Sequence, residues 1–190
     1  MKLLQDKILK DGRILPGDVL KVDSFLNHQI DIELVDKCGL EWYNAFKDMG
    51  ITKILTIEAS GIGIACLAAR HFNVPVVFAK KCRGSGMSSN VFSTRVISYT
   101  HGQSYDVLVS KRYLSADDKV LILDDFLANG SALKALINIA NQAGATIVGL
   151  GAAIEKVYQK GGSSIREMGY RVDSLAKIKS MSLENGIEFE

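Results

Sequence analysis

Apolar residues recur along this chain in two rhythms, one typical of helices and one typical of buried strands. Residues 32–49 carry apolar side chains every three to four positions, which predicts a helix that buries one face. Asp31 is expected to cap this helix, and Gly50 is expected to end it. The expected buried face comprises Ile32, Val35, Gly39, Trp42, Phe46 and Met49. Buried strands are predicted by short apolar runs at 51–57, 74–79, 119–123 and 146–154.

The stretches around these strands predict further helices and one hairpin. Helices are expected at three more places: residues 1–12, residues 62–72, and the stretch from the turn at 128–131 to Gly144. Alternating runs at 92–99 and 105–109 flank residues 101–103 and predict a hairpin. The polar stretch 80–90 is rich in Gly and Ser, which predicts a loop.

Strands that alternate with helices predict an α/β fold with a mostly parallel, twisted sheet flanked by helices on both faces. In such sheets, ligands bind at the carboxyl ends of the strands. Three polar turns are expected at such ends, at 58–61, 124–132 and 155–156. The functional site is therefore expected where these turns meet.

Length and composition fit one globular domain. The chain has 190 residues, of which 47% are hydrophobic and 23% are charged, so it can bury a core of its own. A formal net charge of +2 is too small to indicate a surface for nucleic acid. Cys38, Cys66 and Cys82 lie far apart, so neither a disulfide framework nor a zinc site is predicted.

Several common classes of protein are disfavoured by the sequence. No apolar run approaches the ~18 residues of a membrane span, and the charged first residues do not resemble a secretory signal. We therefore expect a cytoplasmic protein. No P-loop motif occurs, and the three histidines have no Ser or Cys motif that would suggest a hydrolytic triad. Gly61-Ile62-Gly63 begins a dinucleotide-binding pattern, but Cys66 replaces the third glycine, which disfavours NAD.

Two adjacent carboxylates, Asp124 and Asp125, follow the apolar run 119–123. One aspartate would be enough to cap the helix that follows, so the pair suggests a further role. Carboxylates accept hydrogen bonds from the vicinal hydroxyls of a ribose, and they hold Mg²⁺ directly or through water. We therefore favour a functional role for the pair over a capping role.

A turn of small and polar residues leads from the acid pair into the next helix: Ala128, Asn129, Gly130, Ser131 and Ala132. Unpaired backbone N–H groups and the positive end of the helix dipole attract anions at such a position. Small residues let a phosphate approach the backbone, and the side chains of Asn129 and Ser131 add donors. Directly after a pair of carboxylates, this turn fits a sugar phosphate.

Basic and small residues mark a second candidate anion site. The turn Glu58-Ala59-Ser60-Gly61 follows a predicted strand and is a candidate nest of backbone N–H groups. Lys80, Lys81 and Arg83 open the predicted loop 80–90. They are either a solvated basic turn or part of a lid that covers a polyphosphate leaving group and excludes water.

The run 120–132, V-L-I-L-D-D-F-L-A-N-G-S-A, resembles the signature of the type I phosphoribosyltransferases. That signature is an apolar strand, two acids and a short phosphate loop that opens a helix. Asn129, Ser131 and Ala132 depart from its commonest version, in which Thr, a small residue such as Gly, and Ser or Thr stand there. The variant F-L-A-N-G-x-A is similar to one branch of that family, the bacterial xanthine phosphoribosyltransferases. The segment 20–29, L-K-V-D-S-F-L-N-H-Q, is similar to the same branch.

The resemblance covers nearly the whole chain and implies a fold and an assembly. It implies one domain over residues 1–190, with a core at about 50–157. A small hood over the active site would come from residues of about 1–30 and 158–190. Small molecules would be the substrates, a homodimer is expected, and neither nucleic acid nor a membrane is an expected partner.

The reaction implied by the resemblance transfers the 5-phosphoribosyl group of 5-phospho-α-D-ribose 1-diphosphate, the ribose donor, to xanthine in purine salvage. The products would be XMP and diphosphate. Residues 128–132 would hold the 5-phosphate, and Asp124 and Asp125 would lie under the ribose, with Mg²⁺ expected beside the diphosphate. Residues 59–61 would face the diphosphate, and Lys81 would join them as a catalytic residue.

The resemblance also implies a base pocket made by Leu20, Asn27 and Lys156. Xanthine carries two exocyclic oxygens, and the ammonium of Lys156 and the amide of Asn27 can donate hydrogen bonds to oxygens. The exocyclic amine of adenine would match Lys156 poorly. Leu20 would contact the base through packing or through its backbone.

Two alternatives remain open from the sequence. A guanine or hypoxanthine phosphoribosyltransferase would have the same donor site and would differ only in its base pocket. A regulator of the same fold would sense the ribose diphosphate and bind DNA. However, fewer than 60 residues precede the first core strand, and they contain no basic recognition helix.

Overall fold

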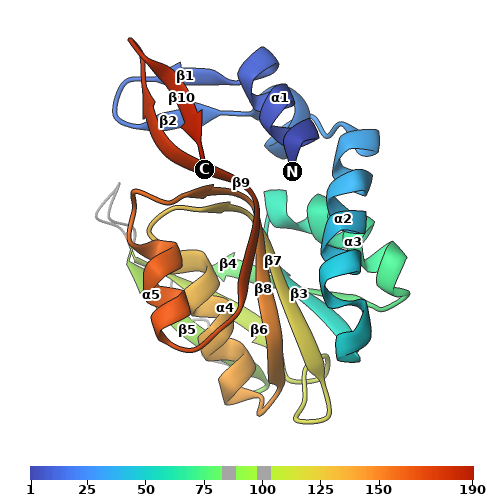
Figure 1. Ribbon diagram of the computed structural model, residues 1–190. Coiled ribbons are helices and arrows are strands. Elements are labelled where there is room, and N and C mark those ends of the chain that lie inside the picture. Colours follow the sequence, from blue (N-terminus) through green and yellow to red (C-terminus); the bar gives the residue numbers. More distant parts are fainter. Residues whose placement is uncertain (83–88, 98–103) are drawn as a thin grey trace.

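The computed structural model describes residues 1–82, 89–97 and 104–190, and its main feature is a sheet between two layers of helices (Figure 1). The strands are β1 (Arg13–Leu15), β2 (Val19–Lys21), β3 (Lys53–Ile57), β4 (Val76–Cys82), β5 (Val91–Ile97), β6 (Ser104–Ser110), β7 (Lys119–Leu127), β8 (Thr146–Lys156), β9 (Val172–Ser182) and β10 (Gly186–Phe189). The α-helices are α1 (Lys2–Asp11), α2 (Ile32–Phe46), α3 (Ser60–Phe72), α4 (Ser131–Gln142) and α5 (Gly161–Glu167).

Parallel strands form the centre of the large sheet. In the described residues its strand order is β10-β9-β8-β7-β3-β4-β6-β5. The strands from β9 to β4 pair in parallel, whereas β10 and the β6–β5 hairpin join the two edges antiparallel. The predicted α/β fold with a mostly parallel sheet is therefore confirmed.

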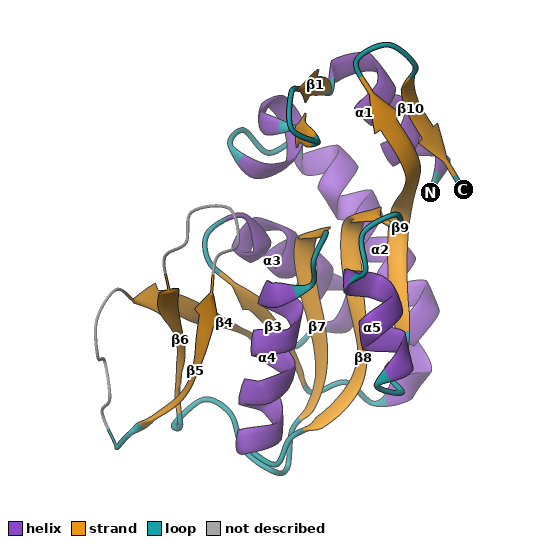
Figure 2. Ribbon diagram, turned by 90° about the vertical axis from the view of Figure 1, so that its left-hand side faces the viewer, coloured by secondary structure: helices purple, strands orange, loops and turns teal. Residues whose placement is uncertain are grey.

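Helices cover both faces of this sheet, and each face has its own apolar core. Figures 1 and 2 show α2 and α3 on one face and α4 and α5 on the other. The first core includes the fully buried Trp42 and Phe46 of α2. In the second core, residues of α4 such as Leu136 pack with Ile122 of β7. Among the described residues, no helix is both long enough and apolar enough to cross a membrane.

A hood lies over the carboxyl ends of the central strands, as Figures 1 and 2 show. We use this name for α1, the β1–β2 hairpin, the helical turn Asp23–Asn27, the end of β9, and β10. Strand β9 joins the hood to the core, because its first part pairs with β8 and its last part pairs with β10. A hood is thus present, but its C-terminal part is shorter than the expected residues 158–190, because α5 and the part of β9 that pairs with β8 belong to the core. The hood brings both ends of the described chain to the same side of the core (Figure 1).

Three strands run further than their apolar residues predict. Strand β7 continues past Leu123 to Leu127, because β8 pairs with it as far as the partners Leu127 and Glu155. Strand β8 reaches Lys156, because β9 pairs with it as far as the partners Lys156 and Ile178. Strand β4 reaches Cys82, because β6 pairs with residues 80–82. Carboxylates and lysines have low strand propensity, but hydrogen bonds to a neighbouring strand compensate for it here.

The long helix α2 shows where periodicity predicts well and where it does not. Asp31 caps it as expected, since its Oδ1 accepts a hydrogen bond from the Leu34 N–H at 3.2 Å. The expected buried face is wrong at its two ends, because Ile32 is 61% and Met49 is 45% exposed. The α-helix ends at Phe46, and a 3₁₀ turn follows before Gly50, which has φ +67°.

Two sequence predictions lie partly outside the described residues. Strands β5 and β6 pair antiparallel, which confirms the predicted hairpin. Its connection at residues 101–103 is not among the described residues. Of the predicted loop 80–90, residues 80–82 belong to β4 and residues 83–88, including Arg83, are not described.

Candidate active site

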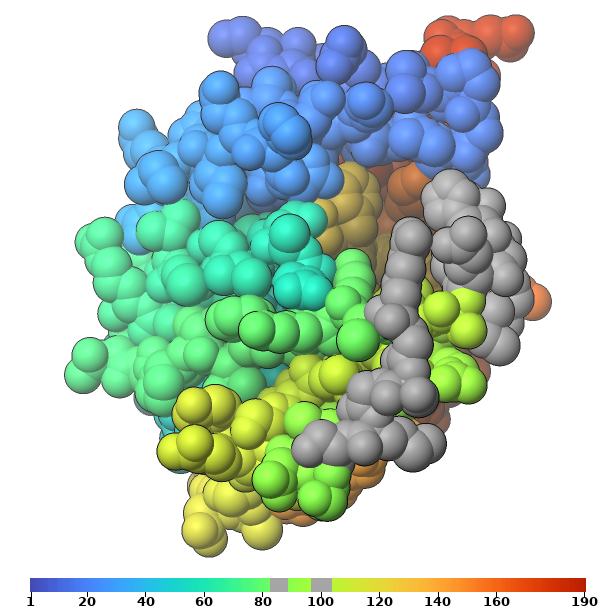
Figure 3. All heavy atoms as spheres, turned by 180° about the vertical axis from the view of Figure 1, so that it is seen from behind, coloured from blue at the N-terminus to red at the C-terminus, as the bar shows by residue number. Residues whose placement is uncertain are grey.

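Most of the candidate residues lie at the carboxyl ends of β3, β7 and β8, beneath the hood, whereas Lys81 belongs to β4 and Leu20 and Asn27 belong to the hood. Seen from behind, the molecule has a hollow between the blue hood and the core (Figure 3). Atoms in the gold and orange of β7 and β8 are visible at the back of this hollow. The acid pair, the phosphate-loop residues 128–132 and Lys156 all belong to the upper ends of these two strands or to the turn that follows them.

The acid pair is held by its own backbone and by the hood. Asp124 is 5% exposed, and its Oδ1 accepts a hydrogen bond from the Asp125 N–H at 2.9 Å. Asp125 is partly exposed, and its Oδ1 accepts from the Phe126 N–H at 2.9 Å. Its second oxygen accepts a hydrogen bond from the Asn27 amide of the hood at 3.3 Å. One residue of the predicted base pocket thus contacts the acid pair directly.

The environment of Asp124 favours the protonated form of its carboxyl group. Burial raises its pKa well above the usual value of 3.8, and the negative charge of Asp125 raises it further. The positive charge of Lys81 acts in the opposite direction, which places Lys81 within electrostatic reach of the pair. A cation or a hydroxyl donor that binds here would therefore stabilise the ionised pair.

The raised pKa of Asp124 predicts a pH-dependent difference in stability between the wild-type chain and Asp124→Asn. The folded state retains the proton of Asp124 above pH 3.8, where the unfolded chain loses it. The wild-type chain therefore loses stability as pH rises from 3.8 through the pKa of the folded state. As pH rises over this range, we expect the melting temperature of Asp124→Asn to increase relative to that of the wild type. Both proteins are measured without added substrate. An equal difference at every pH would contradict the prediction.

The phosphate-loop residues form a tight turn packed against the start of α5. Asn129 Oδ1 accepts a hydrogen bond from the Ser131 N–H at 3.0 Å, and Gly130 has φ +80°, a conformation that favours glycine. The Gly161 N–H donates to the Ala128 carbonyl at 3.1 Å. A Cβ placed on Gly161 would lie 2.2 Å from that carbonyl oxygen, so α5 touches the loop backbone closely.

This close packing makes Gly161→Ala a test of the loop. The new methyl group has no room, so the backbone of residues 128–130 must shift. We expect the KM for the molecule that binds the loop to rise by about tenfold, because small displacements of a binding group cost affinity and rate. The substitution Ser163→Ala, at an exposed position of α5, is the control and should leave this KM unchanged. An unchanged KM in Gly161→Ala would contradict a role for the loop.

The second candidate anion site, residues 59–61, lies beside the acid pair. A Cβ on Gly61 would lie 3.3 Å from Asp124 Oδ1 and 2.2 Å from the Thr56 hydroxyl oxygen. With this packing, only a glycine fits at position 61. Thr56 is fully buried, and its hydroxyl has no hydrogen-bond partner among the described residues. The peptide bond between Glu58 and Ala59 is cis.

Lys156 and Leu20, two residues of the predicted base pocket, lie near the turn between β1 and β2. The Lys156 ammonium donates a hydrogen bond to the backbone carbonyl of Asp18, which has φ +64°. Burial lowers the pKa of Lys156, and the nearby Asp18 carboxylate opposes this shift. Burial, with the charge of Asp18, also raises the pKa of Tyr158 to about 12. Leu20 follows on β2 and is buried in the hood.

Sequence reasoning missed several residues of this neighbourhood. Tyr105 is partly buried, and the pKa of its hydroxyl is raised by burial and by the charge of Asp124. Its ring centroid lies 5.8 Å from the Lys81 ammonium. Asp18 and Thr56 also contact or adjoin the candidate residues. No local motif marks these positions, because pairing and packing bring them together.

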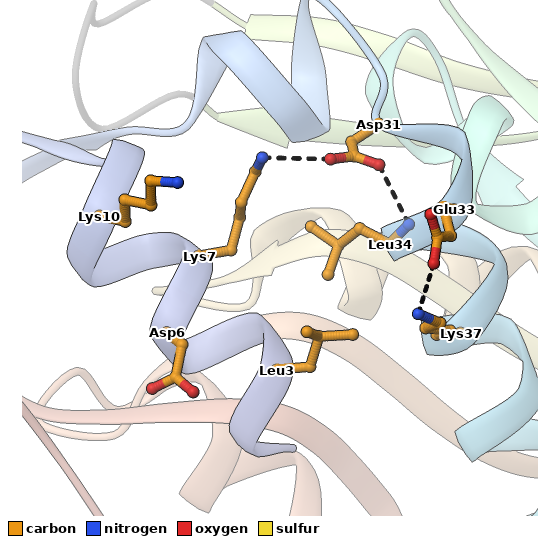
Figure 4. Close-up of a pocket in the computed structure, with 8 residues that line it drawn as sticks. All are labelled: Leu3, Asp6, Lys7, Lys10, Asp31, Glu33, Leu34 and Lys37. Carbon is orange, nitrogen blue, oxygen red and sulfur yellow. Dashed lines mark hydrogen bonds and ion pairs between the residues drawn. The ribbon is translucent and has the colours of Figure 1, made fainter.

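One cavity outside the site is lined by charged residues, most of which form ion pairs. A cavity of about 310 Å³ lies between α1 and the start of α2 (Figure 4). There Lys7 pairs with Asp31 at 3.1 Å, and Lys37 pairs with Glu33 at 2.6 Å. Because these ion pairs satisfy most of its charges, we do not include this cavity in the candidate active site. Among the described residues, no group of three or more His, Cys, Asp or Glu side chains could hold a metal ion.

Comparison with known proteins identifies the fold and the family. Residues 22–180 match the model of the phosphoribosyl transferase domain. The chain is 56% identical to a xanthine phosphoribosyltransferase of Lachnoclostridium phytofermentans, covering 98% of this chain and 96% of that protein. It is also 56% identical to one of Bifidobacterium adolescentis, covering 100% and 99%.

Solved structures share the same fold. An APRTase from Giardia lamblia, complexed with 9-deazaadenine, superposes with a TM-score of 0.78 at 23% identity. That match covers 93% of this chain and 98% of the other. An adenine phosphoribosyltransferase from Trypanosoma brucei, in complex with AMP, pyrophosphate and ribose-5-phosphate, has the same TM-score at 19% identity and covers 96% and 83%. The solved structures agree with the expected fold. Because the family model covers residues 22–180, the chain belongs to the phosphoribosyl transferase domain family.

Proposed function

We propose that the chain is a xanthine phosphoribosyltransferase, which transfers the 5-phosphoribosyl group of the ribose donor to xanthine and releases diphosphate. The observation that carries this proposal is the full-length identity of 56% to enzymes of that name. The geometry supports it, because an acid pair, a tight turn at the N-terminus of α4 and a buried lysine lie beneath the hood. Purine salvage is the process that this reaction serves.

In the proposed donor site, the 5-phosphate binds the backbone N–H groups of residues 128–132, at the N-terminus of α4. Charge-assisted hydrogen bonds from such groups favour a phosphate. The ribose hydroxyls donate hydrogen bonds to Asp124 and Asp125. The diphosphate lies against residues 59–61 and Lys81, whose charge already acts on Asp124.

In the proposed base site, Lys156 and Asn27 donate hydrogen bonds to the exocyclic oxygens of xanthine. Lys156 is 7% exposed, so its ammonium is a largely desolvated hydrogen-bond donor for an oxygen of the base. Asn27 donates to Asp125, so its amide lies beside one of the carboxylates that are proposed to hold the ribose. Leu20 packs against the base from the hood.

Catalysis follows from the charges that develop during transfer. As diphosphate leaves C1 of the ribose, positive charge develops on the sugar and negative charge on the leaving group. Lys81 and the N–H groups of residues 59–61 stabilise the leaving diphosphate. The carboxylates of Asp124 and Asp125 hold the ribose in line with the purine nitrogen that attacks C1. The hood excludes water, which would otherwise hydrolyse the donor.

We infer that Mg²⁺ accompanies the ribose donor. The residues present fit this ion, since Asp124 and Asp125 offer hard oxygen ligands and the donor's own phosphates can supply others. When bound, Mg²⁺ would neutralise charge on the diphosphate. We expect it to arrive with the substrate rather than to occupy a site made by the protein alone.

A coupled assay of diphosphate release tests the proposed function most simply. The ribose donor and Mg²⁺ are kept constant while xanthine, guanine, hypoxanthine and adenine are compared. We expect the highest kcat/KM for xanthine. A higher value for guanine or hypoxanthine would support the related enzyme instead. No release with any base, together with DNA binding in a gel-shift assay, would support a regulator.

We also propose that two copies of the chain form a homodimer through an exposed apolar surface on β4 and β6. A cavity of about 700 Å³ lies there, lined by apolar residues that include Val76, Phe78 and Leu108. Phe78 is 40% exposed, and Lys80 and Arg112 lie at the same cavity. Exposed apolar surface of this kind marks interaction sites.

The substitution Phe78→Asp should convert the dimer to a monomer. A charge placed in an apolar interface must be desolvated without a partner. Light scattering after gel filtration should therefore give 20.7 kDa for the variant and twice this mass for the wild type. Leu183→Asp, at an exposed apolar position of the hood, is the control and should remain dimeric. A dimer that persists in Phe78→Asp would place the interface elsewhere.

Two further expectations stay predictions. They are a cytoplasmic location and a single functional domain over residues 1–190.

A further inference from the structure

The carboxylate of Glu58 lies at a position where the proposed function would favour a neutral or basic side chain. Glu58 directly precedes residues 59–61, which are proposed to face the diphosphate. A negative charge next to a bound polyanion is unfavourable by Coulomb's law. The side chain therefore needs a structural or catalytic reason to be there, and its contacts suggest one.

Glu58 joins the end of β3 to β4 at two points. The regular pairing of these strands ends with Ile57 opposite Ala79. Beyond it, the Glu58 N–H donates a hydrogen bond to the Ala79 carbonyl at 3.0 Å. The Glu58 carboxylate then accepts one from the Lys81 N–H at 2.5 Å, through Oε1. The side chain thus takes over the position of a further strand residue and prolongs the ladder by one hydrogen bond.

This hydrogen bond fixes the backbone of a proposed catalytic residue. On its other edge, β4 pairs with β6, where Lys81 lies opposite Val107. The end of β4 that carries Lys81 is therefore held on both edges, while the Lys81 side chain remains exposed and its ammonium lies 5.8 Å from the Tyr105 ring centroid. The same ammonium acts electrostatically on Asp124.

We propose that Glu58 is a positioning residue, whose carboxylate holds Lys81 beside residues 59–61 so that its ammonium meets the leaving diphosphate. The proposal rests on the function proposed above. Glu58 acts through the hydrogen bond to the Lys81 N–H and not through its charge. The amide oxygen of a glutamine can accept the same bond. Glu58→Gln should therefore behave like the wild type, whereas Glu58→Ala should not.

Hydrogen exchange at the Lys81 amide tests the geometry without any substrate. We expect exchange to be about tenfold faster in Glu58→Ala than in the wild type, and nearly unchanged in Glu58→Gln, because exchange follows local opening. Equal protection of the Lys81 amide in all three proteins would overturn the proposal.

Steady-state kinetics test the role in catalysis. We expect kcat to fall about tenfold in Glu58→Ala, with an unchanged KM for xanthine, and Glu58→Gln to restore most of it. In a Lys81→Ala background, Glu58→Ala should cause little further loss, because the two residues act as a unit. A further loss of about tenfold in that background, or a Glu58→Gln variant as slow as Glu58→Ala, would contradict the proposal. An inactive wild-type chain would instead contradict the proposed function, whatever the exchange result.

Discussion

Replacing both Asp124 and Asp125 by asparagine is expected to reduce kcat/KM for phosphoribosyl transfer by about 10³-fold. Each amide keeps one acceptor oxygen but loses the negative charge, and with it the charge-assisted hydrogen bonds to the ribose and the ligands for Mg²⁺. The measurement is the rate of diphosphate release with saturating Mg²⁺. Activity within about tenfold of the wild type would refute the role of the pair.

The fold should survive this double substitution, which makes the result interpretable. Asp124 is buried beside a like charge, so its ionised form destabilises the folded state and an amide removes that cost. The amide oxygen introduced at position 124 can still accept the hydrogen bond that Asp124 takes from the N–H of residue 125. Circular dichroism and the melting temperature should match or exceed those of the wild type. Asp117→Asn, at an exposed position before β7, is the control and should retain full activity.

Replacing Lys156 by methionine is expected to impair use of the base far more than use of the ribose donor. A buried hydrogen bond from a charged donor contributes ~1.5–3 kcal/mol, so kcat/KM for xanthine should fall roughly 10- to 100-fold. The KM for the ribose donor should change less than about twofold, since no donor group is proposed to touch this side chain. Methionine keeps the length of the buried stem.

The selectivity of this effect decides the assignment of Lys156. Lys179→Met is the matched control, because Lys179 is exposed in the hood and pairs with Glu188 at 2.7 Å. It should leave both kinetic constants unchanged. If Lys156→Met raised the KM for both substrates alike, Lys156 would instead support the hood through its hydrogen bond to the Asp18 carbonyl.

Local sequence predicted the parts of the site whose chemistry is local. The pair Asp124 and Asp125 lies at the end of β7, the turn at Gly130 joins β7 to α4, and the small residue Gly61 lies in the first turn of α3. Their residue types already indicate anion and sugar binding. The alternation of strands with helices predicted the sheet that places these segments at one end, and this part of the fold is confirmed.

The contacts between distant segments could not be predicted in the same way. Asn27 reaches Asp125 across 98 positions, and Lys156 reaches Asp18 across 138. The contact of Gly161 with the loop backbone depends on where α5 packs. The lengths of the strands were underestimated for a related reason. Lys81 and Asp124 have residue types that are typical of turns, and only their pairing with a neighbouring strand shows that they belong to β4 and β7. Tertiary hydrogen bonds outweighed local propensity at these positions.

Calorimetry with the ribose donor tests the central claim most directly. That claim is that the acid pair and the phosphate loop together bind 5-phospho-α-D-ribose 1-diphosphate. Titration of this donor with Mg²⁺ into the folded chain should give saturable heat with one site per chain, and the heat should be largely lost in the Asp124→Asn, Asp125→Asn double variant. No heat with the wild-type chain, or equal binding by the double variant, would contradict the account.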